Sequence, residues 1–113
     1  MDCLFCKIAK KEIPAQVVFE NKDIIAFRDI APQAPVHILI ISKKHIPSMN
    51  DITVQDAALL GQIQFVAKEL ARQENISADG YRLVLNCGKN GGQAVAHLHY
   101  HLLGGRKFTW PPG

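Results

Sequence analysis

The sequence predicts an α+β fold: an antiparallel sheet of about five strands, with one long helix on a face and a short N-terminal helix. Short apolar runs typical of strands recur along the chain, and only one segment keeps apolar residues at helical spacing over many turns. The connections between the strand-like runs are too short for the crossover of a dozen or more residues that a parallel pair requires. Because 113 residues suffice for about one core, we expect a single domain over residues 1–113.

The first part of the chain predicts a short helix followed by a hairpin. Apolar Leu4, Phe5, Ile8 and Ala9 lie at helical spacing and indicate a helix that stops before Pro14. Residues 16–20 and 24–30 have the composition of strands, and the turn-forming residues 21–23 join them. We therefore expect these two strands to pair.

The rest of the chain predicts three strands and the long helix. The apolar segment 36–42 indicates a strand covered on both faces, and residues 81–86 indicate another. The helix is expected over residues 54–74. A glycine-rich turn at residues 88–92 then leads into a last strand over residues 95–103.

Two features support the long helix. Thr53 and Asp56 have the spacing of a capping box at its start. Apolar residues follow at helical spacing and form a single stripe, which is expected to face the sheet. The stripe consists of Ala57, Leu60, Ile63, Ala67 and Leu70, widened by Leu59 and Val66.

Composition and charge exclude several classes of function. The net charge is +3 and the basic residues are scattered, so neither a nucleic-acid partner nor a nucleic-acid groove is expected. The apolar runs are too short to cross a membrane, and the chain does not open like a secretory signal peptide. We therefore expect a cytoplasmic protein, whose cysteines are free or metal-bound rather than disulfide-bonded. The mild positive charge suits a small anionic ligand such as a phosphate ester.

Three of the five histidines alternate with apolar residues in "AVAHLHYHLLGG", residues 94–105. In a strand, His97, His99 and His101 would share one face, ~6.5–7 Å apart. Two imidazoles at this spacing can contact one phosphate, and backbone N–H groups of the preceding glycine-rich turn can contact it as well. Competing interpretations are a catalytic zinc held by all three histidines and a surface strand without function.

The histidine pattern favours covalent catalysis at phosphorus. A neutral imidazole is a competent nucleophile near pH 7, and a second imidazolium can stabilise the developing negative charge. Such a site suits the hydrolysis of a nucleotidyl bond in two displacements, which requires no metal.

At this point the sequence resembles a known family. "HLHYHLL" fits the His-φ-His-φ-His-φ-φ signature of the histidine triad superfamily, where φ is apolar. "DIAPQAPVHILIISKKHI" and "GGRKFTWPPG" resemble its Hint branch, the purine nucleoside phosphoramidases. The resemblance runs nearly end to end, from "LFCKI" to the last residue.

The resemblance implies roles for four histidines. His99 corresponds to the nucleophile that takes the AMP group, and His101 to the histidine that contacts the phosphate. His97 corresponds to the residue that orients the nucleophile. His37 corresponds to a histidine that supports the triad through a hydrogen bond, although a buried structural histidine is an equal alternative.

The resemblance also implies a nucleotide site for AMP or a related phosphoramidate. Asp29 corresponds to the residue that binds ribose hydroxyls. The positions of the phosphate region are Asn86, Gly92 and Gln93, and the apolar walls of the purine pocket are Leu4, Phe5, Ile8, Phe27 and Ile30.

One position departs from the family pattern. Many Hint proteins carry Ser or Thr after the glutamine of "GGQ", where its hydroxyl assists the leaving group, but this chain has Ala94. The expected activity is cleavage of a purine nucleoside phosphoramidate to AMP and an amine. The alternatives are an AMP-binding regulatory module with weak catalysis and a dinucleoside polyphosphate hydrolase of the sister branch.

The spacing of Cys3 and Cys6 is that of metal ligands. Zinc would need two more ligands, and His45 and His97 are available; some relatives with this cysteine pair bind structural zinc through matching residues. The alternative is two small core residues. Cys87 has no partner in the sequence pattern and is expected to be an apolar filler.

The end of the chain predicts a homodimer. Trp110 is followed by Pro111 and Pro112 on a segment that cannot continue a strand, and tryptophan is enriched at interfaces. Hint relatives form two-fold dimers whose C-terminal segments reach toward the partner's active site. The alternative is that the tail packs on its own core.

Overall fold

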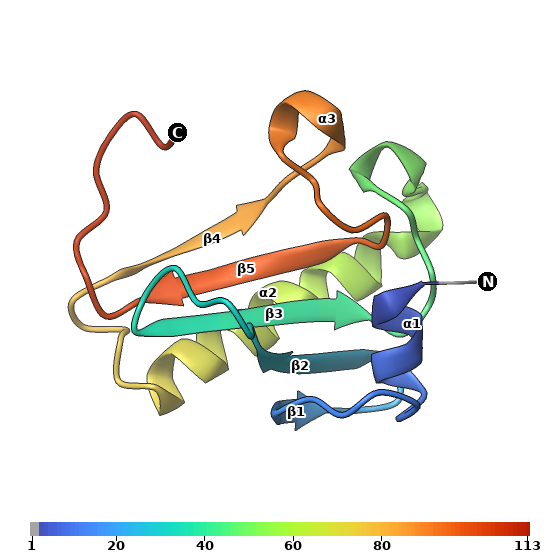
Figure 1. Ribbon diagram of the computed structural model, residues 1–113, viewed down its shortest axis with the longest axis horizontal. Coiled ribbons are helices and arrows are strands. Elements are labelled where there is room, and N and C mark those ends of the chain that lie inside the picture. Colours follow the sequence, from blue (N-terminus) through green and yellow to red (C-terminus); the bar gives the residue numbers. More distant parts are fainter. Residues whose placement is uncertain (1–2) are drawn as a thin grey trace.

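The computed structural model describes residues 3–113 as one five-stranded antiparallel sheet with helices on both faces (Figure 1). The strand order is β1-β2-β3-β5-β4, so β1 and β4 form the two edges. The strands are β1 (Val17–Glu20), β2 (Ile24–Arg28), β3 (Val36–Ser42), β4 (Tyr81–Leu85) and β5 (His99–Gly104). The helices are α1 (Leu4–Ala9), α2 (Ala57–Gln73) and α3 (Gly88–Gly91), with 3₁₀ turns η1 (Met49–Asp51) and η2 (Val54–Asp56). The predicted fold class is confirmed.

The long helix α2 covers one face of the sheet and forms the main core with it (Figure 1). Side chains alternate between the two faces of a strand, so every second residue of β3 and β5 points toward α2. Ile38, Ile40 and Leu102 are fully buried there against Ile63 and Leu70 of α2. Each such side chain contributes roughly 1.5–3 kcal/mol through burial.

The short helix α1 lies on the opposite face, mainly over β2 and β3. Phe5 and Ile8 pack against Phe27 and Leu39 in a second, smaller cluster. Phe5 also contacts the ring of His99 at the start of β5, and His99 and His101 lie on this face, as the alternation of β5 predicts.

The last strand is shorter at its start than predicted, and this changes the position of one histidine. It begins at His99 rather than at residue 95. The His97 N–H donates to the carbonyl of Val95 (2.9 Å), and the Leu98 N–H donates to the carbonyl of Ile46 (2.6 Å). These bonds turn the chain out of the sheet before β5 starts, so the prediction that His97 shares a strand with His99 and His101 is wrong.

The start of the long helix also differs from the prediction. Residues 54–56 form a 3₁₀ turn, and the capping box of Thr53 and Asp56 closes this turn rather than the α-helix. Ala57, the first residue of α2, is exposed instead of buried, and Leu60 is only partly buried. The buried stripe is Ile63, Val66, Ala67, Leu70 and Ala71.

Smaller differences concern the ends of elements. The strands predicted over 16–20, 24–30 and 81–86 are each one or two residues shorter. The glycine-rich turn contains the one-turn helix α3, which ends at Gly92 with a left-handed φ of 81°. No helix within residues 3–113 is both long and apolar enough to cross a membrane. The prediction about the chain's opening rests partly on residues 1 and 2, which lie outside the described range.

Candidate active site

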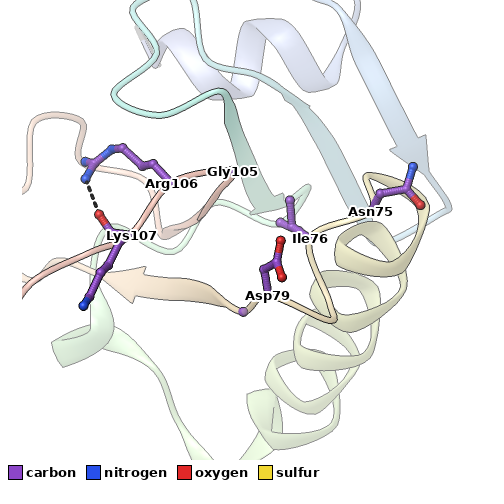
Figure 2. Close-up of a pocket in the computed structure, with 7 residues that line it drawn as sticks. Asn75, Ile76, Asp79, Gly105, Arg106 and Lys107 are labelled. Atoms are coloured by element: carbon purple, nitrogen blue, oxygen red, sulfur yellow. Dashed lines mark hydrogen bonds between the residues drawn. The ribbon is translucent and has the colours of Figure 1, made fainter.

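The cavities of the structure differ in the chemistry of their walls. One, of about 470 Å³, lies between the C-terminal end of α2 and the segment after β5 (Figure 2). Its walls include Asn75, Asp79 and Lys107 but no histidine or cysteine. Two others adjoin the histidines and share His101, so the candidate site lies there.

The first of these two, which we call the apolar cavity, has a volume of about 290 Å³ and lies between α1, β2 and β5. It brings together most of the residues that the sequence singles out, among them Asp29, His99 and His101, and the Asp29 carboxylate lies within 4.8 Å of a ring nitrogen of His101. Ile30 at its mouth is fully exposed. The predicted residues in its walls are Leu4, Phe5, Ile8, Phe27, Asp29, Ile30, Ala94, His99 and His101.

The sequence did not single out five apolar residues of this cavity. Ile13, Pro14 and Ala15 follow α1 and close one side, while Leu39 and Val95 complete the wall. The alternation of β3 could have identified Leu39, which pairs with His101 and shares its face. Nothing in the local pattern indicates the other four.

A hydrogen bond of the His99 ring determines which of its two nitrogens carries the hydrogen and which keeps a lone pair. Its Nδ1 lies 2.7 Å from the backbone carbonyl of His97. A carbonyl can only accept, so Nδ1 carries the hydrogen and the neutral ring keeps its lone pair on Nε2. The ring is buried, and the edge of Phe5 packs on it at 5.0 Å between ring centroids. Nε2 is therefore the nitrogen available for attack.

His101 and His37 are hydrogen-bonded to each other beside His99, and the Asp29 carboxylate lies close to both. The Gln33 N–H donates to His37 Nδ1 (3.0 Å), so the neutral His37 ring carries its hydrogen on Nε2. That Nε2 lies 2.9 Å from His101 Nδ1 and 3.4 Å from a carboxylate oxygen of Asp29. His101 Nδ1 therefore accepts, and its own hydrogen lies on Nε2.

Burial favours the uncharged form of this pair. Burial, which is the largest cause, and the neighbouring His99 and His37 together lower the pKa of His101 to about 4, against the opposing charge of Asp29. Burial likewise lowers the pKa of His37, against the opposing charge of Asp29. Near neutral pH His101 is thus a neutral N–H donor. The lowered pKa thus favours a neutral donor at this position, whereas the sequence led us to expect an imidazolium.

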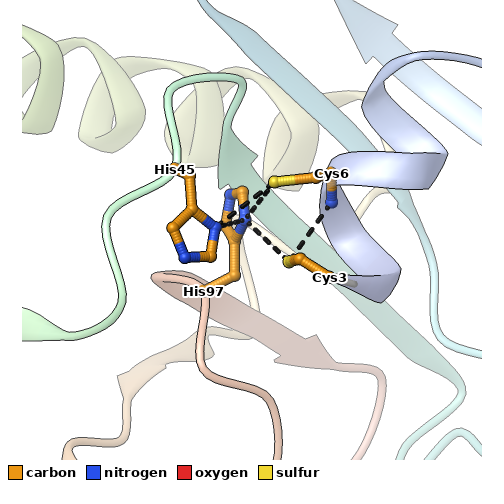
Figure 3. A group of neighbouring side chains, drawn as sticks. All are labelled: Cys3, Cys6, His45 and His97. Carbon is orange, nitrogen blue, oxygen red and sulfur yellow. Dashed lines mark hydrogen bonds between the residues drawn. The ribbon is translucent and has the colours of Figure 1, made fainter. Parts of the chain in front are cut away.

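His97 belongs to a separate cluster with Cys3, Cys6 and His45 (Figure 3). Its Nε2 donates to the carbonyl of Ser42 (2.7 Å), so its Nδ1 lone pair points at the other three residues. This Nδ1 lies 3.4 Å from Cys3 Sγ, 3.5 Å from Cys6 Sγ and 3.2 Å from His45 Nδ1.

These four donors have the spacing of a tetrahedral metal site. A zinc ion with bonds of ~2.3 Å to sulfur and ~2.0–2.1 Å to nitrogen holds sulfur and nitrogen about 3.5 Å apart and two nitrogens about 3.3 Å apart. Burial lowers the pKa of His97, which favours the neutral ring that a metal requires. Burial and the adjacent Cys3 raise the pKa of the Cys6 thiol. The cluster could therefore hold a metal ion such as zinc.

The three residues predicted for the phosphate region lie outside the walls of the apolar cavity. Asn86 lines the neighbouring cavity with His101. The Gln93 amide is engaged within its loop, where it donates to the carbonyls of Pro47 (2.7 Å) and Val95 (3.0 Å) and accepts from the Gly88 N–H (3.0 Å). Gly92 is exposed at the end of α3.

Comparisons with known proteins identify the family of this site. Residues 10–108 match the HIT domain family. The crystal structure of a HIT family hydrolase from Legionella pneumophila Philadelphia 1 is 62% identical, with a TM-score of 0.98 over 99% of this chain and 100% of that one. An uncharacterised HIT-like protein of Synechococcus elongatus is 52% identical over 112 residues, 99% of this chain and 97% of that protein. A histidine triad nucleotide-binding protein from Candida albicans is 33% identical, with a TM-score of 0.82 over 97% and 83% of the two chains.

The tautomer and charge of His101 provide a direct test of the site. We expect long-range ¹H–¹⁵N spectra at pH 7 to show a neutral His101 with its hydrogen on Nε2. Because its pKa is lowered, the stability contributed by the neutral ring is complete above pH ~6.5 and is lost as the pH falls toward about 4. A His101 ring that titrates near pH 6.5, or carries its hydrogen on Nδ1, would contradict the assignment.

Proposed function

We propose a nucleotide hydrolase function for this chain, which belongs to the HIT family. Its specific activity would be the cleavage of purine nucleoside phosphoramidates through a covalent nucleotidyl-histidine intermediate on His99. The observation that carries this proposal is the hydrogen bond from His99 Nδ1 to the His97 carbonyl (2.7 Å). It leaves the Nε2 lone pair free between the apolar cavity and the N–H donor of His101.

The apolar cavity would hold the nucleoside. A flat purine suits the walls formed by Phe27, Leu4 and Ile8, which offer apolar surface and few competing polar groups. Asp29 lines the cavity close to His101, and its carboxylate would accept hydrogen bonds from ribose hydroxyls next to the phosphate. The phosphate would then extend to the two histidines.

The reaction would proceed in two displacements at phosphorus. His99 Nε2 attacks, the new N–P bond forms, and the P–N bond to the amine breaks. The His101 N–H donates to a phosphate oxygen and stabilises the charge that develops there. A water molecule then attacks the same phosphorus, the N–P bond to His99 breaks, and AMP leaves. In sum, one water and one phosphoramidate give AMP and an amine.

Ala94 affects the first displacement, because the departing amine needs a proton. The residue lines the apolar cavity and has no hydroxyl. In this chain the proton would come from water. We therefore expect poorly activated amines to be released more slowly than with a hydroxyl at this position. Ala94 is also the observation that favours the alternative, an AMP-binding module with weak catalysis, and turnover distinguishes the two.

Replacement of the nucleophile tests the proposed function. We expect His99→Asn to lower the release of AMP from an adenosine phosphoramidate by at least about a thousandfold, while AMP affinity stays within about tenfold. His101→Asn keeps the nucleophile and removes one charge-stabilising donor, so it should lose only about 10²–10³-fold. Chromatography measures AMP release and calorimetry measures affinity. Turnover by His99→Asn close to that of the unmodified protein would contradict the assignment.

We also propose that the cluster of Cys3, Cys6, His45 and His97 holds zinc. Four protein ligands leave no open position, so the ion would stabilise the structure rather than activate water. It would link α1, which carries part of the purine wall, to the residue whose carbonyl orients His99.

Metal content tests this second proposal. Protein purified without a histidine tag or chelator should contain close to one zinc per chain by elemental analysis. Cys6→Ser should lose most of the metal and lower the melting temperature. Cys87→Ser, a control at a cysteine outside the cluster, should retain the metal. Well under one zinc per chain in the unmodified protein would overturn the proposal.

A homodimer is the proposed assembly. Trp110 is 82% exposed and Phe65 of α2 is 73% exposed, so neither packs on the core of its own chain. The edge strand β4 also presents backbone groups that can pair with a second copy. These features support an interface along that edge.

Sedimentation measures this assembly. At micromolar concentration the protein should sediment as a species of twice the 12.5 kDa chain mass. Trp110→Ala should shift the equilibrium toward the monomer, because tryptophans are frequent interface hot spots. A single 12.5 kDa species for the unmodified protein would show that the dimer proposal is wrong.

A further inference from the structure

The second cavity beside His101, which we call the basic cavity, differs in character from the apolar one. It has a volume of about 630 Å³ and lies over β4, β5 and the C-terminal tail. Its walls include two arginines, Arg82 and Arg106, and the aromatic residues Phe108 and Trp110, but no aspartate or glutamate; Gly113, with the terminal carboxylate, also lines it.

The sheet register places this cavity next to the reacting histidines. Val84 of β4 pairs with His101, and Arg82 pairs with Leu103. Residues two apart on a strand share a face, so Arg82 lies one same-face position from the residue opposite His101. His101 lines both cavities, so a substrate whose phosphorus contacts it has its nucleoside on one side and its leaving group on the other.

The two guanidinium groups are held in place by uncharged partners. Arg106 lies over the Phe108 ring at 4.3 Å and Arg82 at 5.2 Å. Arg106 Nε donates to the carbonyl of Gln33 (3.1 Å), and Arg82 Nη2 donates to the carbonyl of Thr109 (2.9 Å). Stacking and carbonyl bonds orient a guanidinium but do not neutralise its charge.

The other two arginines of the chain are paired with carboxylates, and these two are not. Arg28 bonds Glu74 through two nitrogens, and Arg72 bonds Glu69. Within residues 3–113, neither Arg82 nor Arg106 has a carboxylate within ion-pair distance. Figure 2 shows the Arg106 side chain extending away from Asp79, the acidic residue of the neighbouring cavity.

We propose that Arg82 and Arg106 select leaving groups that carry a carboxylate, such as an amino acid joined to phosphorus through its amine. The inference rests on the proposed function, because it concerns the leaving group of that reaction. A guanidinium presents several N–H donors in one plane and binds carboxylates in preference to neutral amides. Oriented, unpaired guanidinium groups beside His101 therefore favour an acidic leaving group over a neutral one of the same size.

Two matched substrates test this selectivity. One is adenosine 5′-phosphoramidate of glycine, which carries a free carboxylate, and the other is its glycinamide analogue, which is neutral and of equal size. The measured quantity is the ratio of their kcat/KM values. Because the two amines differ in intrinsic reactivity, the informative comparison is the ratio in each variant against the ratio in the unmodified protein.

Each arginine is then replaced in turn. We expect Arg82→Gln and Arg106→Gln each to lower the ratio of carboxylate to amide substrate about threefold to fivefold, and the double variant to lower it further. Arg82→Lys, which keeps the charge, should recover part of the ratio. Lys107→Gln removes the same charge from the next residue, which does not line the basic cavity, and should leave the ratio unchanged. Added salt should reduce the ratio of the unmodified protein.

The outcomes separate this inference from the proposed function. Variants that lose activity equally on both substrates would show that the arginines only hold the tail, and the inference would be wrong. The inference would also be wrong if Lys107→Gln lowered the ratio of the two kcat/KM values as much as Arg82→Gln does. If the unmodified protein cleaves neither substrate, the proposed function itself fails.

Discussion

The arrangement of the site depends on how His97 is held. Its backbone N–H donates to Val95, its carbonyl accepts from His99 Nδ1, and its ring donates to the carbonyl of Ser42. Every hydrogen-bonding group of the residue is thereby committed except ring Nδ1, which faces the two cysteines and His45. One residue thus fixes both the orientation of His99, the proposed nucleophile, and the position of one donor in the cluster with Cys3, Cys6 and His45. Partners of this kind set the tautomer of a reactive histidine more firmly than solvent can.

His101 divides one face of the sheet into two regions of different chemistry. The side toward α1 is apolar, with Asp29 as its acidic residue, and the side toward β4 carries two unpaired arginines. Between them lies the half-buried His101, whose pKa is lowered to about 4, so it contributes a hydrogen-bond donor without a full charge. A neutral donor suits a site that binds an anionic phosphate and then releases it as AMP.

Much of this face could be predicted from the sequence, because a strand alternates. The period of two residues puts His99 and His101 on the face opposite Tyr100 and Leu102. The departure of His97 from the strand could not be predicted, because the turn depends on contacts with Ile46 and Ser42, some fifty residues away in sequence.

The contacts of Gln93 and of the two arginines also could not be predicted from the local sequence pattern. The sequence and its resemblance assigned Gln93 to the phosphate, but its amide holds together the loops that precede β5, and only the fold brings Pro47 within reach. The stacking of Arg82 and Arg106 on Phe108 joins β4 to the tail and has no periodic signature. The positions of residues that meet through a turn or a tail depend on tertiary contacts, and these outweigh the local secondary-structure preference of the sequence.

The central claim is that His99 forms a covalent bond to the nucleotide, and rapid-quench mass spectrometry measures it directly. The protein would be mixed with an adenosine phosphoramidate, denatured within milliseconds at alkaline pH, where a phosphorus–nitrogen bond to histidine survives, and then digested. The account predicts one adenylyl group per chain, on the peptide that contains residues 97–101 and at His99, formed before AMP appears. An adenylyl group on His101, or AMP release with no adenylylated protein at any time, would contradict it.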